Sequence, residues 1–75
     1  MTIDLIKGNN TATVMRIMRE NGLGFYAEEE TWDGLPRLIF TAETCGEETR
    51  RAEVTFNWEG TKAVDLSYWE VTDPF

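Results

Sequence analysis

The hydrophobic pattern of this chain changes period once, at Gly24, and this change constrains the fold more than any other feature. Before Gly24, the apolar residues Val14, Ile17 and Met18 recur at the spacing of one helical face. After it, apolar and polar residues alternate in runs that turn residues separate, as in strands with one buried face. The pattern therefore predicts an α+β domain in which one helix precedes an antiparallel sheet.

The predicted helix covers residues 11–21 and has a stop signal at each end. Asn10 can cap its first free N–H groups, and Gly22 can end it in the left-handed conformation. The stripe expected to contact the sheet is Val14, Ile17, Met18 and Leu23. The residues expected to face outward are Arg16, Arg19 and Glu20. Residues 2–7 fit either an additional strand or a helical turn, and both options stay open.

Four strand-like runs follow the helix, and the short connections between them predict a meander. The runs are residues 25–32, 37–44, 50–58 and 62–71. We expect a two-residue turn at Asp33-Gly34, a looser loop over residues 45–48, and a three-residue loop over residues 58–60 with Gly60 left-handed. The whole chain, residues 1–75, is expected to form this single domain.

The register of these hairpins decides which side chains share a face, because a slip of one residue inverts a strand. Keeping apolar residues opposite one another predicts the pairs Glu30 with Arg37, Ala27 with Phe40, Leu38 with Phe56, Val54 with Val64, and Glu53 with Asp65. The face covered by the helix then consists of Phe25, Ala27, Leu38, Phe40, Ala42, Ala52, Val54, Phe56, Val64, Leu66 and Tyr68.

The opposite face is expected to combine carboxylates with aromatic side chains, and only Arg37 and Arg51 lie among them as counter-charges. An exposed aromatic patch ringed by charge is typical of an interface. The residues predicted to bind a partner are Tyr26, Glu28, Glu30, Trp32, Glu43, Glu47, Glu48, Glu53, Asp65 and Trp69. The alternative interpretation is an acidic face that serves only solubility.

The charge balance limits the partners that we expect. Fourteen Asp and Glu against seven Lys and Arg give a net charge of -7, which repels phosphate backbones and anionic membranes. With no histidine and one cysteine, the chain lacks the residues for Ser-His-Asp or Cys-His catalysis, histidine-ligated zinc or an internal disulfide. We expect a protein that is not an enzyme, has no cofactor or metal, and is cytoplasmic, since no secretory signal pattern is visible.

The spacing of carboxylates on a sheet allows an imitation of DNA. Acids two residues apart on a strand lie about 6.7 Å from each other, and the neighbouring strand adds a row about 4.8 Å away. A DNA strand presents one phosphate per about 3.4 Å of helix axis. Two adjacent acidic strands approach this density of negative charge.

A very small, acidic α+β domain with carboxylates on an open sheet resembles the phage-encoded inhibitors of bacterial nucleic-acid enzymes, including anti-CRISPR proteins. The resemblance rests on size, charge and organisation along the whole chain. It implies a non-enzymatic DNA mimic that occupies a Lys- and Arg-lined channel of a nucleic-acid-handling complex, for example a CRISPR effector, in the host bacterial cytoplasm. The alternative is a structural or assembly protein whose aromatic face makes homodimer or particle contacts.

Overall fold

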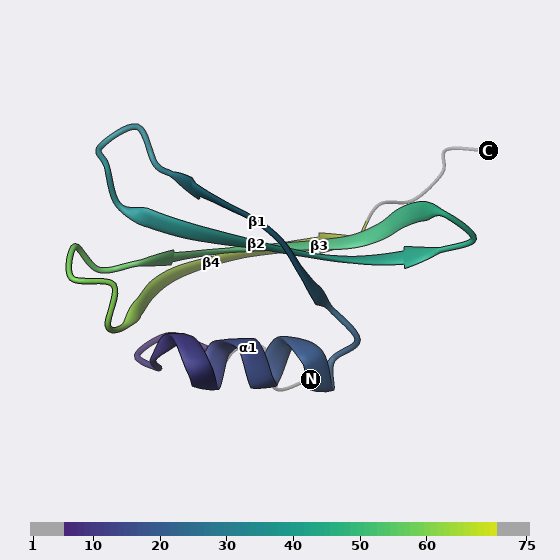
Figure 1. Ribbon diagram of the computed structural model, residues 1–75, viewed down its shortest axis with the longest axis horizontal. Coiled ribbons are helices and arrows are strands. Elements are labelled where there is room, and N and C mark those ends of the chain that lie inside the picture. The colour runs from purple at the N-terminus through teal and green to yellow at the C-terminus, as the bar shows by residue number, and fades with distance from the viewer. Residues whose placement is uncertain (1–5, 71–75) are drawn as a thin grey trace.

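The computed structural model describes residues 6–70 of the 75-residue chain. Its elements are helix α1 (Thr11–Glu20) and strands β1 (Gly24–Glu30), β2 (Pro36–Thr44), β3 (Glu47–Phe56) and β4 (Ala63–Glu70). The strands form one antiparallel sheet in the order β1-β2-β3-β4, and α1 lies against one face of it (Figure 1). The prediction of one short helix and a four-stranded antiparallel meander is confirmed.

Helix α1 begins and ends at the predicted signals. The Asn10 side chain accepts a hydrogen bond of 2.9 Å from the Thr13 N–H, and this caps the helix. Gly22 follows the helix with φ +78°, a conformation that favours glycine. The predicted stripe of Val14, Ile17, Met18 and Leu23 is buried, whereas Arg16, Arg19 and Glu20 are exposed. The amphipathic pattern therefore orients the helix correctly.

The core fills the space between α1 and the sheet. Its largest fully buried side chains are Phe40, Phe56, Ile6, Met18, Leu23, Val14 and Val54. The chain before α1 is attached to the start of β4, because Gly8 donates to the Ala63 carbonyl at 2.7 Å and Ala63 donates to the Asn9 carbonyl at 2.9 Å. Most of residues 2–7, for which strand and helix stayed open, lie outside the described residues, as does the predicted end of the last strand at Val71.

The loop between β1 and β2 has three residues, 32–34, and the predicted two-residue turn is wrong. The Thr31 N–H donates to the Leu35 carbonyl at 2.9 Å, and the Gly34 N–H donates back to the Thr31 carbonyl at 2.9 Å. Gly34 has φ +87°, the left-handed position that three-residue hairpin loops require. The extra loop residue shifts the register of β1 by one.

This shift moves the acidic side chains of β1 to the other face of the sheet. The observed pairs are Glu28 with Leu38, Glu29 with Arg37, Glu30 with Pro36, and Ala27 with Ile39. Glu28 and Glu30 therefore lie on the helix-facing side and Ala27 on the outer side, opposite to the prediction. A bulge between Phe25 and Ala27 returns Phe25 to the core side, where it pairs with Phe40.

The turn between β2 and β3 is tighter than predicted. Cys45 and Gly46 both have positive φ, +54° and +81°, as a two-residue hairpin turn of the mirror-image type requires. Strand β3 consequently starts at Glu47, and Leu38 pairs with Val54 in place of the predicted Phe56. Since this shift is two residues, both strands keep their predicted faces.

The last hairpin has a four-residue loop, residues 58–61, and not the predicted three. The Asn57 side chain accepts hydrogen bonds from the Thr61 N–H at 2.8 Å and the Lys62 N–H at 3.2 Å, which closes the loop. Gly60 is left-handed, as predicted, with φ +73°.

The pairing of β3 with β4 also differs from the prediction. Val54 faces Leu66, Glu53 faces Ser67 and Asp65 faces Thr55. Val64 is the extra residue of an irregularity in this pairing and is half-exposed, whereas Ala63 is buried in its place. The predicted like-charge pair of Glu53 and Asp65 is therefore wrong, as is the placement of Val64 on the covered face.

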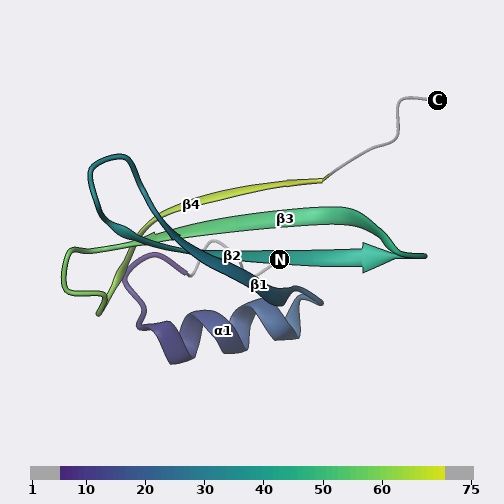
Figure 2. The same cartoon turned by 45° about the horizontal axis from the view of Figure 1, so that its top comes forward.

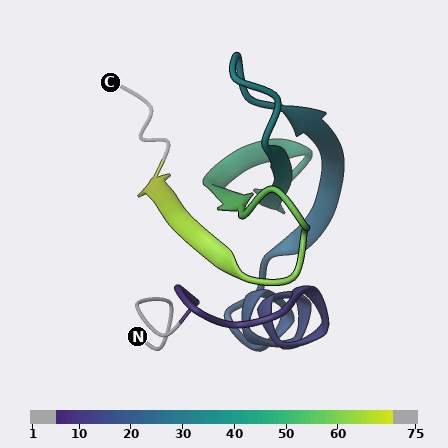
Figure 3. The same cartoon turned by 90° about the vertical axis from the view of Figure 1, so that its left-hand side faces the viewer.

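The sheet has two distinct ends. Loops 32–34 and 58–61 lie at one end together with the start of α1, and the Cys45-Gly46 turn lies at the other (Figure 1). We call the first of these the loop end. Seen from there, the sheet is strongly twisted and β1 curves around its side (Figure 3). Helix α1 runs below β1 and β2 (Figure 2).

Candidate functional site

The structure separates the ten predicted site residues into three places. Tyr26, Glu53, Asp65 and Trp69 lie on the outer face. Glu28, Glu30 and Trp32 lie toward the loop end, with the two glutamates on the helix-facing side. Glu43, Glu47 and Glu48 lie at the Cys45-Gly46 turn. The single acidic and aromatic face expected from the sequence is therefore not formed.

The outer face carries a chain of ion pairs in which two arginines alternate with three glutamates. In order, Glu29 contacts Arg37 at 3.5 Å, Arg37 contacts Glu53 at 3.7 Å, Glu53 contacts Arg51 at 3.0 Å, and Arg51 contacts Glu48 at 3.3 Å. We call these five residues the ladder. Two of these pairs join neighbouring strands and two lie within β3, and through them each carboxylate of the ladder already has a cation.

Arg51 is the most connected member of the ladder. Its hydrogen bond to Glu53 raises its pKa above the ordinary value for arginine; partial burial opposes this shift, and the charges of Glu53 and Glu48 add to it. A raised pKa means that this interaction stabilises the charged form of Arg51 in the folded protein. The Arg51 guanidinium also lies 5.9 Å from the centre of the Tyr26 ring, and Trp69 is its cross-strand neighbour.

The centre of the outer face is buried. Ile39 is only 2% exposed although it points away from the helix, and its cross-strand neighbours there are Ala27 and Glu53. Thr55 is buried on the same face. The side chains at the middle of the outer face are thus shielded from solvent. The sequence signal for this burial was a large apolar residue at the middle of a central strand.

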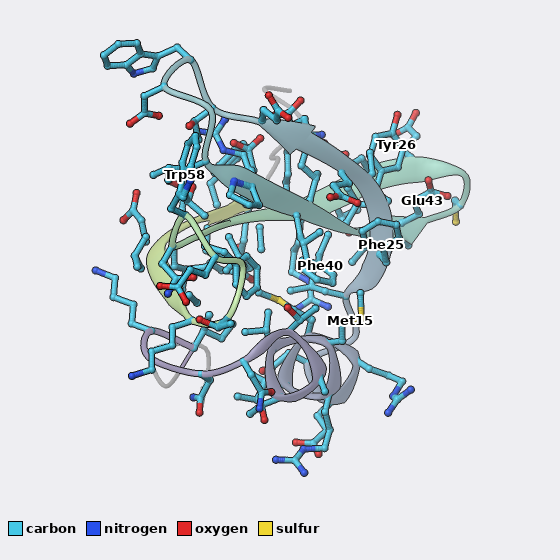
Figure 4. The ribbon with its side chains drawn as sticks, turned by 60° about the vertical axis from the view of Figure 1, so that its left-hand side comes forward. Met15, Phe25, Tyr26, Phe40, Glu43 and Trp58 are labelled. Atoms are coloured by element: carbon cyan, nitrogen blue, oxygen red, sulfur yellow. The ribbon has the colours of Figure 1, made fainter. Side chains whose placement is uncertain are left out.

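At the Cys45-Gly46 turn, Glu43 pairs directly with Glu48. Opposed acids repel each other by a few tenths of a kcal/mol, on the order of other cross-strand pairs. Arg51 offsets the charge of Glu48, whereas Glu43 and Glu47 have no ion pair within the described part of the chain. These two glutamates are exposed, and Figure 4 shows Glu43 far from Trp58 at the loop end.

The loop end exposes two tryptophans. Trp32 is 97% exposed at the tip of the first hairpin, and Trp58 is 71% exposed in the last one. The two loops touch, because a Cβ atom added at Gly34 would lie 3.2 Å from the Trp58 ring. Trp58 was missed as a site residue, although its position in a loop beside Glu59 and Gly60 was visible in the sequence.

Carboxylates without an ion pair in residues 6–70 gather around these tryptophans. They are Glu28, Glu30, Asp33 and Glu59. Asp33 accepts a hydrogen bond from the Thr31 hydroxyl. Lys62 follows the second loop and is the nearest basic residue to it along the sequence. The carboxylates at the loop end are therefore available to a partner, whereas those of the ladder are already paired with arginines.

An apolar groove opens between α1 and β1 on the helix-facing side. Its larger part, about 310 Å³, starts near Gly60 at the loop end and is lined by Met15, Phe25, Glu28 and Leu38. A smaller part of about 190 Å³ shares Met15 and Phe25 and continues to Arg19. We call the two parts together the α1–β1 groove. Figure 4 shows Met15, Phe25 and Phe40 close together in it, with Tyr26 on the other side of β1.

Within residues 6–70, no group of three or more cysteine, aspartate and glutamate side chains is arranged to hold a metal ion. Helix α1 has ten residues, and no helix in the same range has the length and apolar character needed to cross a membrane.

Comparison with known proteins adds no relative: no protein-family model, curated protein or solved structure matches the chain.

Proposed function

We propose that this protein is a non-enzymatic, protein-binding inhibitor of the anti-CRISPR type, which occupies a basic DNA-binding channel of a bacterial nucleic-acid-handling complex. The observation that carries the proposal is the loop end, where Trp32 and Trp58 are 97% and 71% exposed among carboxylates that have no ion pair in residues 6–70. An exposed tryptophan pair in an acidic surround suits a partner rich in lysine and arginine.

Charge and aromatic surface contribute to different steps of binding, the encounter and the dissociation. The net charge of -7 accelerates the encounter with a basic channel, and this acceleration falls as salt rises. Trp32 and Trp58 can then stack on arginine or receive lysine over their rings, and burying them slows dissociation. DNA is excluded because the same basic side chains cannot hold both molecules.

The loop end supports this function better than the outer face does. A partner arginine that approached Glu53 would have to replace Arg37 or Arg51, which already bind it. Exchanging one ion pair for another brings little net affinity. Glu28, Glu30 and Trp32 therefore stay in the proposed site, Trp58 and Glu59 join it, and Tyr26, Glu43, Glu47, Glu48, Glu53, Asp65 and Trp69 are left outside it.

The experiment is capture of partners from bacterial lysate on the immobilised protein, with elution by a salt gradient and identification by mass spectrometry. The captured complex is then purified, and its loading of fluorescent DNA is measured by anisotropy with and without this protein. We expect the double variant Trp32→Ala, Trp58→Ala to raise the inhibitory concentration at least about tenfold, as for paired interface hot spots.

A charge-matched control separates a specific site from general acidity. The double variant Glu20→Gln, Glu70→Gln removes two charges far from the loop end, and the variant Glu28→Gln, Glu30→Gln removes two beside it. We expect the second pair to weaken inhibition clearly more than the first. Equal effects of the two pairs, or unchanged DNA loading with any captured complex, would contradict the proposal.

The outer face favours a second candidate, a homodimer or particle contact. Tyr26 and Trp69 flank Arg51, whose charge Glu53 and Glu48 already balance, so this patch could be covered without leaving an unpaired charge. Sedimentation at low and high salt tests it. A dimer that persists in high salt and is lost in Trp69→Ala would favour assembly, and a monomer at all salt concentrations would contradict it.

A further inference from the structure

We propose that the free edge of β1 and the α1–β1 groove together bind an extended segment of the partner, which joins the sheet as an antiparallel strand beside β1. The segment carries lysine or arginine opposite Glu28 and Glu30 and apolar side chains over Met15 and Phe25. This inference rests on the proposed function and names the part of the partner that the protein grips.

The backbone of β1 is available for such pairing. β1 is the first strand of the sheet, and no strand in residues 6–70 pairs with its outer edge. Thr31 and Leu35 form a hydrogen-bonded pair, and Pro36, which lacks an N–H, lies opposite Glu30. Because antiparallel pairs alternate, the N–H and C=O groups of Glu28 and Glu30 point away from β2. These groups are the donors and acceptors that an added strand uses.

The groove beside this edge has an apolar floor. Phe25 is 53% exposed and Met15 is 39% exposed, and both line the two parts of the groove. The Phe25 ring packs edge-on against Phe40 with a centroid distance of 5.9 Å, so it is held in place (Figure 4). An added strand would direct alternate side chains onto this floor and cover it.

The charges around the groove select a basic segment. Glu28 lines the groove, and Glu30 shares its face through the pairing with Pro36. Neither glutamate has an ion pair in the described part of the chain. Cations placed opposite them in an adjacent strand would be favourable cross-strand pairs. At the other end of the groove, Arg19 repels basic side chains, which limits where the cations of the segment can lie.

A second copy of this chain fits the edge poorly. Antiparallel pairing of two β1 edges would bring together two copies of the acidic run from Glu28 to Glu30. The other edge strand, β4, is already attached at Ala63 to residues 8–9 and carries Asp65 and Glu70, so pairing it with β1 also opposes acids. Like charges directly opposite one another destabilise a strand pair. The charge pattern therefore indicates a basic partner segment.

The test uses a capped peptide, Lys-Thr-Lys-Thr-Leu-Thr-Phe, whose lysine, leucine and phenylalanine side chains fall on one face of a strand. Binding to the intact protein is followed by amide chemical shifts and hydrogen exchange. We expect the Glu28 and Glu30 amides to exchange at least about tenfold more slowly with saturating peptide, because they become hydrogen-bonded.

Two N-methylated peptides separate strand addition from attraction by charge. The lysines that pair opposite Glu28 and Glu30 direct their backbone N–H groups to β1, so methylating the backbone nitrogens of both lysines blocks the pairing. Methylating two threonines leaves these N–H groups intact. We expect the first peptide to lose binding and the second to retain it. Equal binding of both peptides would overturn the inference.

A pair of protein variants tests the groove at constant charge. Met15→Gln makes its floor polar, whereas Ala12→Gln changes an exposed residue of the same helix outside the groove. We expect about tenfold weaker peptide binding for Met15→Gln, which loses one apolar contact, and unchanged binding for Ala12→Gln.

The same variants are then compared in the DNA-loading assay. If Met15→Gln inhibits normally while Trp32→Ala, Trp58→Ala does not, the groove inference fails and the proposed function stands. If the peptide binds as expected but no complex is inhibited, the proposed function fails and the groove remains a binding site for basic strands.

Discussion

The two faces of the sheet carry the same acidic residue type in opposite situations. On the outer face, Glu53 contacts Arg37 at 3.7 Å and Arg51 at 3.0 Å. On the helix-facing side, Glu28 lies at the rim of an apolar groove with no ion pair in the described residues. The difference shows that the net charge of a surface does not reveal whether it can bind a partner, because ion pairs within the molecule decide which carboxylates are free.

The arrangement also shows why the two faces contribute differently to stability. The helix-facing side is stabilised by burial of Phe40, Phe56 and Val54 against α1. The outer face has no covering layer in residues 6–70, and its side chains cover one another instead, with Ile39 enclosed at the centre. Substitutions on each side can test this division, in the following order of expected effect.

Phe40→Ala should have the largest effect on stability. Phe40 is fully buried between α1 and the sheet, and removing its ring leaves a cavity that costs about 3–5 kcal/mol. In a domain of this size, such a loss is comparable with the whole free energy of unfolding. Urea unfolding followed by circular dichroism measures it. A loss below about 1.5 kcal/mol would mean that the helix does not cover this side as described.

Ile39→Ala should follow, at about 2–4 kcal/mol, although its side chain points away from the helix. Ile39 is 2% exposed, nearly as well buried as its neighbour on the other face. The same urea experiment, run beside the first variant, compares the two faces at adjacent positions. An open outer face would instead give the small change of an exposed site, within about 0.5 kcal/mol.

Arg37→Ala should destabilise the fold by about 1–2 kcal/mol, since Glu29 and Glu53 would lose their shared cation while partly buried. Arg16→Ala is the control, because its pair with Glu20 is exposed and should contribute no more than about 0.5 kcal/mol. Adding Glu29→Gln to Arg37→Ala should restore part of the loss, because Glu29 has no other ion pair in residues 6–70. Strict additivity of the two substitutions would show that they do not interact.

Glu28→Gln with Glu30→Gln should change stability least, by no more than about 0.5 kcal/mol in either direction. Within residues 6–70 neither carboxylate has an ion pair to lose, and removing both lowers the repulsion within the acidic run of β1. Thermal unfolding at low and high salt provides the measurement. A loss above about 1 kcal/mol would indicate that these glutamates support the fold and are not free for a partner.

The candidate site was predictable only in part, and the position of Glu28 explains why. Its residue type and exposure were evident from the acidic run in an alternating strand. Its face depended on whether the loop before Leu35 has two residues or three, and Asp33-Gly34 is compatible with both. Trp32 and Trp58 could be assigned to loops, but their proximity depends on the contact of Trp58 with Gly34.

The local sequence determined the elements. The helix begins after Asn10 and ends before Gly22, and alternation after Gly24 produces four strands with left-handed glycines between them. These features depend on neighbouring residues, so a linear pattern contains them. Tertiary structure alone decided which residues share a face, which arginine each glutamate contacts, and which edge stays open. Those outcomes depend on bulges and on loop lengths that differ by one residue. The local energies of these alternatives differ little, so the packing of the whole sheet on α1 decides among them.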